Sequence, residues 1–246
     1  MKKLTSIILI LFLSLLSSPS WSETISFDDL VERNDIYYKK FTNTPYTGNI
    51  ETYHSNGQLR NLGKLVDGNF EGYYLQYWEN GVLAANGEYL FGNKYGIWEW
   101  FSKEGNLARV ANYNKRGNED GDWVDYYSKT GKIRWKGKYT NGCKDGLWEG
   151  FFENGNIKYL ENFNGDVSRI KCLIIPQNKE GTSKWFYENG QIWFVENYKN
   201  GKMDGLSEYY FENGQLKHIG NYKNGEKVGL WNYFNEDGTL EKSDTW

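Results

Sequence analysis

The sequence predicts an all-β protein: an elongated antiparallel meander of about eight tandem β-hairpin repeats of ~24 residues, in a twisted or coiled single-layer sheet. Three observations predict this fold class. A glycine recurs with a period near 24 residues, aromatic and aliphatic residues recur in register with it, and glycine-centred turns divide each period into two short segments. Two turns per period predict two strands per period, which is a hairpin.

The register of the repeat is set by a glycine that begins similar segments, such as "GLWEG" and "GLWNY". Five residues after each of these glycines stands an aromatic residue, and about eleven residues after it stands Leu or Ile. Near the seventeenth position comes an aromatic residue or Leu, and in the final repeat this position is Trp246. The glycines are Gly48, Gly72, Gly96, Gly121, Gly146, Gly181, Gly205 and Gly229.

The turns recur with the same period. Asn213-Gly214 and Asn224-Gly225 predict two successive type I′ turns, because both central residues of such a turn need positive φ and both residue types tolerate it. Two turns in each period leave strands of roughly five to seven residues, which is an ordinary strand length. A helical protein is disfavoured by the frequent glycines and the lack of a long 3.6-residue pattern.

Residues 1–22 have the three parts of a secretory signal peptide. Two lysines form the charged start, Leu4 to Leu16 form a 13-residue apolar core, and Ser20 and Ser22 supply small residues for cleavage. The apolar run is shorter than the ~20 residues that span a bilayer. A retained anchor is the alternative, but we expect export of a soluble chain to a periplasm or beyond.

Residues 23–47 are expected to form an entry segment before the repeat array, which covers residues 48–246. Within the entry segment, residues 26–34 are the only plausible helix, with Ser26 as its cap and two aspartates in its first turn. Such a helix would cover the edge of the first strand. The alternative is a mobile leader.

Charge and cysteine content limit the possible partners. Removal of the two lysines of the signal changes the formal net charge from −3 to −5, which argues against nucleic-acid binding. Cys143 and Cys172 permit one disulfide in an exported chain, and two unpaired cysteines are the alternative. The array is interrupted by an irregular insertion near residues 164–180, which is either a loop or a degenerate extra strand.

An aromatic ladder is the main candidate for a binding face. The chain contains 11 Trp and 20 Tyr residues, and one ring recurs two positions after the repeat glycine. On stacked hairpins these rings would line one face, where they could contact a sugar, a lipid or a partner protein. The alternative is that they pack on one another as cross-strand pairs. The candidate residues are Tyr74, Trp98, Trp123, Trp148 and Trp231.

The pattern NGxxxGxWxxYYxNGxLxxxxxY resembles the MORN-repeat variant family, the divergent bacterial form of the MORN repeat. It matches best from Asn141 to Tyr159 and from Asn224 to Leu240, and residues 27–48 resemble the entry segment of such arrays. The resemblance implies a YwqK-type antitoxin-like or immunity-like protein. The sequence departs from the pattern at Ser183 and Ser207, where Trp is expected, so these two repeats are predicted to be less well packed or open on one face.

No sequence pattern indicates catalysis. His54 and His218 lie in different repeats, and no HExxH, CxxC, GxSxG or phosphate-binding loop is present. We therefore expect no enzyme, no cofactor and no metal, but an exported scaffold that binds another protein. The alternatives are a module that binds cell-wall glycan or choline polymer, and a MORN protein associated with membrane lipid. An exposed edge at Trp246 also allows an edge-to-edge dimer.

Overall fold

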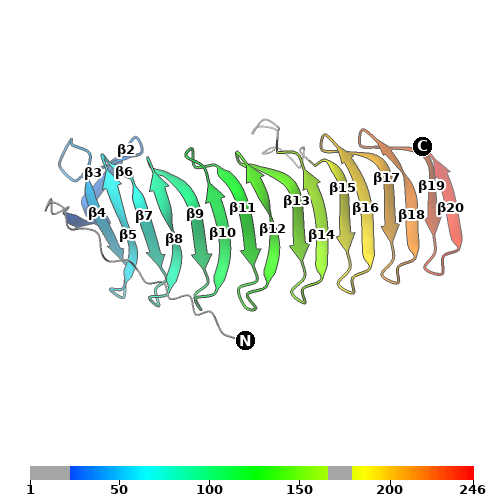
Figure 1. Ribbon diagram of the computed structural model, residues 1–246, viewed down its shortest axis with the longest axis horizontal. Coiled ribbons are helices and arrows are strands. Elements are labelled where there is room, and N and C mark those ends of the chain that lie inside the picture. Colours follow the sequence, from blue (N-terminus) through cyan, green and yellow to red (C-terminus); the bar gives the residue numbers. More distant parts are fainter. Residues whose placement is uncertain (1–22, 166–178) are drawn as a thin grey trace.

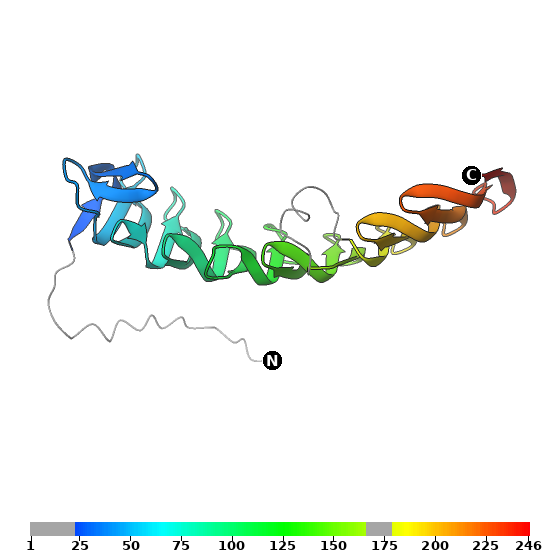
Figure 2. The same cartoon turned by 90° about the horizontal axis from the view of Figure 1, so that it is seen from above.

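The computed structural model describes residues 23–165 and 179–246. One 18-stranded sheet contains β1 and β4–β20, and β2 and β3 form a separate two-stranded sheet. Hairpins lie side by side along one long axis (Figure 1), and the ribbon is thin, curved and twisted when it is seen from above (Figure 2). The predicted all-β meander of tandem hairpins is therefore confirmed.

The strands of the entry segment are β1 (Thr24–Ser26), β2 (Leu30–Arg33) and β3 (Ile36–Lys39). The strands up to the insertion are β4 (Gly48–Tyr53), β5 (Leu59–Val66), β6 (Asn69–Phe70), β7 (Gly72–Tyr77), β8 (Leu83–Leu90), β9 (Asn93–Phe101), β10 (Leu107–Tyr113), β11 (Glu119–Tyr126), β12 (Ile133–Thr140), β13 (Cys143–Phe151) and β14 (Ile157–Phe163). The strands after the insertion are β15 (Gly181–Phe186), β16 (Ile192–Lys199), β17 (Lys202–Tyr210), β18 (Leu216–Lys223), β19 (Glu226–Phe234) and β20 (Leu240–Thr245).

The entry segment covers the first strand edge, but with a strand rather than a helix. β1 pairs in parallel with β4. The helix considered for residues 26–34 is reduced to a single 3-10 turn, Phe27–Asp29. The Ser26 side chain does cap this turn, since its hydroxyl accepts a 3.3 Å hydrogen bond from the Asp28 amide. The following residues then extend into β2, because they pair with β3 in a small hairpin instead of continuing the helix.

Two different turns alternate along the chain. Asn224 and Gly225 both have positive φ, 53° and 94°, as a type I′ turn requires. At the preceding turn, however, only Gly214 is left-handed, so the predicted type I′ turn at Asn213 is wrong. Here the Gly214 amide donates to the Phe211 carbonyl, and the Asn213 side chain accepts from the Gln215 amide. This is a type I turn followed by a glycine bulge, in which the asparagine is chosen for its side chain rather than its φ.

The repeat glycine marks a second bulge, which at Gly146 lies inside β13. Gly146 has a φ of 65°, and the register between β12 and β13 shifts beside it. A glycine tolerates this left-handed conformation without strain, which explains why it recurs. After the bulge the strand resumes regular pairing with its neighbours.

Side chains connect successive hairpins along both long edges of the ribbon. On one edge, the turn asparagines donate to the carbonyl of the turn glutamate one repeat later, as in Asn189 to Glu212 at 3.0 Å. On the other edge, an acidic side chain accepts from a turn amide, as in Glu180 from Asn200 at 2.9 Å. These bonds hold each hairpin against the next outside the backbone ladder.

The junction between β14 and β15 has the shortest continuous pairing within the repeat array after β7. Among the described residues, only Tyr159↔Trp185 and Leu160↔Lys184 are paired there, with an isolated bridge between Phe163 and Lys179. By contrast, β13 and β14 share six paired positions. The insertion predicted near residues 164–180 falls at this junction, and its residues 166–178 lie outside the described residues.

Candidate functional site: the aromatic face

The tryptophans of the predicted ladder are buried rather than displayed. Trp98, Trp148 and Trp231 are 2%, 0% and 1% exposed, and Trp123 is 7% exposed. Tyr74 is partly buried. All five point to one side of the sheet, which we call the aromatic face, because side chains alternate between the two sides of a strand. The structure therefore places the four tryptophans of the ladder in the core and leaves Tyr74 partly exposed.

Three of the four buried indoles lie over a glycine of the preceding strand, and the fourth, Trp123, is paired with Ala111. A Cβ at Gly87 would come within 2.2 Å of the Trp98 ring, and one at Gly137 within 2.3 Å of the Trp148 ring. Gly220 has the same relation to Trp231. The missing side chain makes the space that the ring fills. In a single-layer sheet, which has no second layer to pack against, this pairing buries the largest side chains.

Backbone carbonyls and lysines complete the environment of these rings. Trp98 Nε1 donates to the Glu88 carbonyl at 2.9 Å, and Trp148 Nε1 donates to the Lys138 carbonyl at 3.1 Å. For the three indoles that lie over a glycine, a lysine four residues earlier lies over the ring, and burial lowers the pKa of two of these lysines, Lys94 and Lys144. The Nζ-to-centroid distances are 4.5 Å for Lys94 and Trp98, 4.3 Å for Lys144 and Trp148, and 4.2 Å for Lys227 and Trp231. The lysines cover the outer ring faces by cation–π contact.

The two repeats that lack tryptophan are closed, contrary to the prediction that they are open or poorly packed. Ser183 and Ser207 are each 1% exposed. Where the tryptophan repeats have Gly or Ala on the preceding strand, these two have Glu161 and Glu196, which are 7% and 4% exposed. A carboxylate side chain thus fills the volume that an indole fills elsewhere.

The two buried glutamates have different partners. Glu161 Oε1 accepts from Lys179 Nζ at 2.6 Å and from Trp185 Nε1 at 3.1 Å. Glu196 accepts from the hydroxyls of Tyr198 and Tyr209, the first at 2.7 Å. Burial and the Glu196 carboxylate raise the pKa of both tyrosines. The protein therefore satisfies these carboxylates internally.

A stack of rings runs beside the glutamates on the same face. Its members occupy directly opposed positions on β14 to β18 and lie face to face, with centroid separations of 4.9, 5.8, 5.0 and 4.3 Å. Burial, reinforced by Lys227 and Lys217, lowers the pKa of the last member, His218, to about 4. The faces of these rings stack against one another, so mainly the ring edges are exposed to solvent. In order they are Tyr159, Trp185, Phe194, Tyr209 and His218.

One exposed aromatic residue was missed by the sequence analysis. The first turn of each repeat is followed by a bulge whose extra residue has no cross-strand partner, and in one repeat this residue is Trp193. It is 41% exposed. A comparison of the repeats at this one position would have found it. The equivalent residues are Arg60, Ala84, Ala108, Arg134, Lys158, Lys217 and Glu241.

Comparison with protein families assigns four of the repeats. Residues 94–115, 144–164, 179–200 and 203–224 match the family model described as MORN repeat variant. Four hairpins of the ribbon match the MORN repeat variant. Each match begins two residues before the repeat glycine, at the position where Lys94, Lys144 and Lys179 stand. A search of curated proteins finds no match to the chain.

The predicted disulfide has one end in the described structure. Cys143 is 2% exposed and is not a free thiol. Its predicted partner, Cys172, lies outside the described residues, so the pairing stays a prediction. Cys143 begins the strand β13, within one residue of the start of the second matched MORN repeat.

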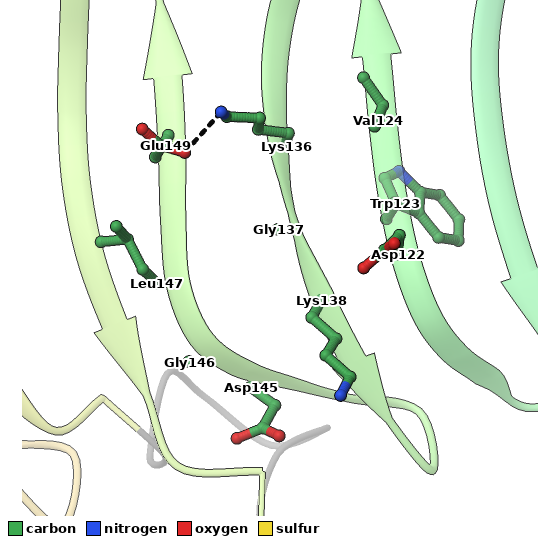
Figure 3. Close-up of a pocket in the computed structure, with 10 residues that line it drawn as sticks. All are labelled: Asp122, Trp123, Val124, Lys136, Gly137, Lys138, Asp145, Gly146, Leu147 and Glu149. Carbon is green, nitrogen blue, oxygen red and sulfur yellow. Dashed lines mark ion pairs between the residues drawn. The ribbon is translucent and has the colours of Figure 1, made fainter.

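The face opposite the aromatic face carries an open hollow of about 470 Å³ over the middle of the repeat array. Figure 3 shows its charged lining, in which Lys136 reaches across to Glu149 at 2.8 Å. Asp145 accepts from Thr140 and from the Gly165 amide, so it holds backbone in place. Val124 and Leu147 provide the apolar part of the lining. Three of the charged side chains, those of Lys136, Glu149 and Asp145, are thus paired within the protein.

No group of three or more His, Cys, Asp or Glu side chains that could hold a metal ion is found in residues 23–165 and 179–246. Within the same ranges, no helix is of a length and apolarity that would let it cross a bilayer.

Proposed function

We propose that the protein is an exported, non-catalytic scaffold that binds another protein. The MORN repeats suggest a binding scaffold built from repeats. The observation that carries the proposal is the contrast between constant and variable positions. The repeat glycine and the aromatic–aliphatic pairs recur throughout, whereas the bulge position changes among small, basic, acidic and aromatic residues. In repeat proteins, a constant framework that presents variable surface residues is typical of partner recognition.

The absence of catalysis is part of the proposal. The buried carboxylates Glu161 and Glu196 are occupied by lysine, indole and tyrosine donors. A general acid or base needs a substrate within hydrogen-bond reach, and these groups are enclosed by the fold. We accordingly expect that the purified protein turns over no substrate.

Binding of another protein is favoured over binding of a glycan because most aromatic ring faces are covered by other side chains. Stacking on a sugar needs an open ring face, but the rings between Tyr159 and His218 cover one another. The large indoles beside them are buried, and lysines lie over three of them. The formal negative charge likewise argues against attachment to anionic lipid.

Antitoxin or immunity activity is the more specific form of this proposal, and the signal peptide predicted for residues 1–22 favours a place of action outside the cytoplasm. In that form the bound partner is a toxin, and the scaffold neutralises it by covering its working surface. Co-expression of the chain with a toxin gene from the same neighbourhood would then restore growth.

The test is a comparison of two binding assays with the chain from residue 23 onward. We expect it to form a complex with one envelope protein that survives gel filtration and forms again from the two purified components. Sedimentation with peptidoglycan in the absence of any protein partner would overturn the proposal in favour of glycan binding. Substrate turnover that is lost on changing one polar side chain would overturn its non-catalytic part.

A further inference from the structure

Trp193 is an indole that the fold does not require. At the same bulge every other repeat has alanine or a charged residue, and those repeats form the same hairpin. A large apolar side chain that is 41% exposed, at a position where lysine or alanine serves equally well, is typical of a residue used for binding. The extra residue of a bulge is also a position from which a side chain is re-aimed out of the sheet.

The ring of Trp193 is held in one place by its neighbours. Its centroid lies 5.1 Å from that of Phe194, 5.9 Å from that of Tyr187 and 6.4 Å from that of Trp185. These contacts fix the orientation of the indole before a ligand arrives, which reduces the entropy lost on binding.

Lysines occupy the equivalent bulge on either side of Trp193. Lys158 Nζ lies 5.5 Å from the centroid of the Phe152 ring, and Lys217 Nζ lies 5.3 Å from that of the Phe211 ring. Tyr187, which contacts Trp193, is the equivalent of these two phenylalanines in its own repeat. The three side chains therefore lean the same way over matching rings, and they form a line of cation, indole and cation along the ribbon.

The spacing of this line fits an extended polypeptide. Lys158, Trp193 and Lys217 stand on β14, β16 and β18, so each is two strands from the next. Two strand separations amount to ~9.6 Å, and one three-residue turn of a polyproline II segment, whose side chains recur on the same side at every third residue, covers ~9.3 Å. Side chains at positions i, i+3 and i+6 of such a segment would meet the three groups in turn.

We propose that Lys158, Trp193 and Lys217 bind a segment of a partner protein in the polyproline II conformation that has acidic side chains at i and i+6 and an aromatic or apolar side chain at i+3. This inference rests on the proposed protein-binding function and names the chemistry of the partner. The two lysines complement the acidic groups, and the indole packs on the central side chain. The exposed turn glutamates Glu153, Glu188 and Glu212 border the line, so they repel acidic groups that are out of register.

The test uses short labelled peptides and fluorescence polarisation with the chain from residue 23 onward. One peptide has Glu, Phe and Glu at positions 1, 4 and 7 of a proline-rich background, which favours polyproline II, and the comparison peptide has them at positions 1, 5 and 9 of the same background. We expect the first to bind at least about fivefold more tightly than the second, and its affinity to fall as salt is raised.

The matched variants separate binding from folding. Trp193→Lys gives the bulge the residue that its two neighbouring repeats already have, so the melting temperature should be preserved. We expect this variant to lose at least about tenfold in peptide affinity. Leu206→Lys, which changes an exposed apolar residue on the opposite face, should bind as the unchanged protein does.

Three results would overturn the inference: equal affinity for both spacings, equal affinity of the Trp193→Lys variant, or Trp193-dependent binding of acidic oligosaccharides in the absence of peptide binding. Its failure can be told apart from failure of the scaffold function. If the Trp193→Lys variant still forms the envelope complex described above, the scaffold function stands, but the partner does not bind through Lys158, Trp193 and Lys217. If no protein complex forms with the unchanged chain, the scaffold function itself fails.

Discussion

The tryptophan repeats, which begin at Gly96, Gly121, Gly146 and Gly229, differ from the serine repeats, which begin at Gly181 and Gly205, in how they fill the same space. In the first group an indole covers a glycine or packs by an alanine, and in the second a glutamate extends over a serine. The cation changes its role as well. Lys144 lies on an indole, whereas the equivalent Lys179 pairs with a carboxylate.

This difference shows that the repeat requires a filled volume and paired charges, not a particular residue. The second serine repeat goes a step further. It has Met203 where the first has Lys179, and its glutamate is satisfied by two tyrosine hydroxyls instead. Positions far apart in the sequence therefore change together because they share one volume on the aromatic face.

The largest expected effect comes from emptying that volume in a tryptophan repeat. Trp148→Ala should lower the free energy of unfolding by about 4 kcal/mol, because it leaves a cavity over Gly137. Ser183→Ala, at the same position of a serine repeat, should change it by less than about 1 kcal/mol. Urea denaturation monitored by circular dichroism measures both. Equal effects would show that the two kinds of repeat do not differ in what holds them together.

The next largest loss of stability is expected in a serine repeat, when the lysine that pairs with the buried glutamate is removed. Lys179→Met leaves Glu161 buried without a positive partner, which we expect to cost about 3 kcal/mol. Lys184→Met is the control, since Lys184 follows Ser183 in the same repeat and its side chain is exposed. The same denaturation measurement applies. If Lys179→Met were as mild as its control, the indole of Trp185 alone would satisfy the carboxylate.

Conversion of a serine repeat into a tryptophan repeat tests the comparison directly. Glu161→Gly and Ser183→Trp should each destabilise alone, the first by leaving a void and the second by overpacking. Together they recreate the arrangement of Gly137 and Trp148, so the double variant should be more stable than the sum of the single effects predicts by about 1–3 kcal/mol. A double-mutant cycle measures this coupling energy. If the destabilisations of the two single variants simply add in the double variant, the side chains at positions 161 and 183 do not share one volume.

The smallest expected effect is a pH dependence in the ring stack. Burial lowers the pKa of His218 from 6.5 to about 4, so the unfolded chain binds the proton more readily than the folded one. The stability from neutral His218 is fully present above pH 6.5 and is lost as pH falls towards 4, by about 1 kcal/mol after allowance for solvent screening. His218→Phe keeps the stack and should remove this part of the pH profile. Melting temperatures of both proteins between pH 4 and pH 7 provide the measurement, and identical slopes would rule out His218 as the cause.

Much of the fold could be predicted from the sequence because its signals are local and repeated. The repeat glycine, the glycine turns and the aromatic–aliphatic pairs each recur often enough to define strands and register. The turn at Asn213 was predicted wrongly because an Asn-Gly pair fits both turn types, and the choice depends on a hydrogen bond to Glu236 in the next hairpin. Residues 26–34 were ambiguous for a similar reason, since pairing of β1 with β4 is a tertiary event.

The candidate site was harder to predict because burial is decided by partners on other strands. The ladder of indoles was recognised from spacing, but its burial depends on glycines such as Gly137, whose role is visible only once strands are adjacent. The packing of Ser183 and Ser207 likewise depends on Glu161 and Glu196, which lie on the neighbouring strands. Trp193 differs from the residues at the same position of the other repeats, but this position follows no regular pattern, so the periodicity does not point to it.

The short pairing between β14 and β15 has a mechanical consequence for a protein whose hairpins touch only their neighbours. Tension applied to the two ends of the ribbon passes through every junction in series, so the ribbon yields first where the fewest backbone bonds resist separation. That place is between Leu160 and Lys184, and it divides the molecule into two stretches that would keep their shape while the joint between them opens.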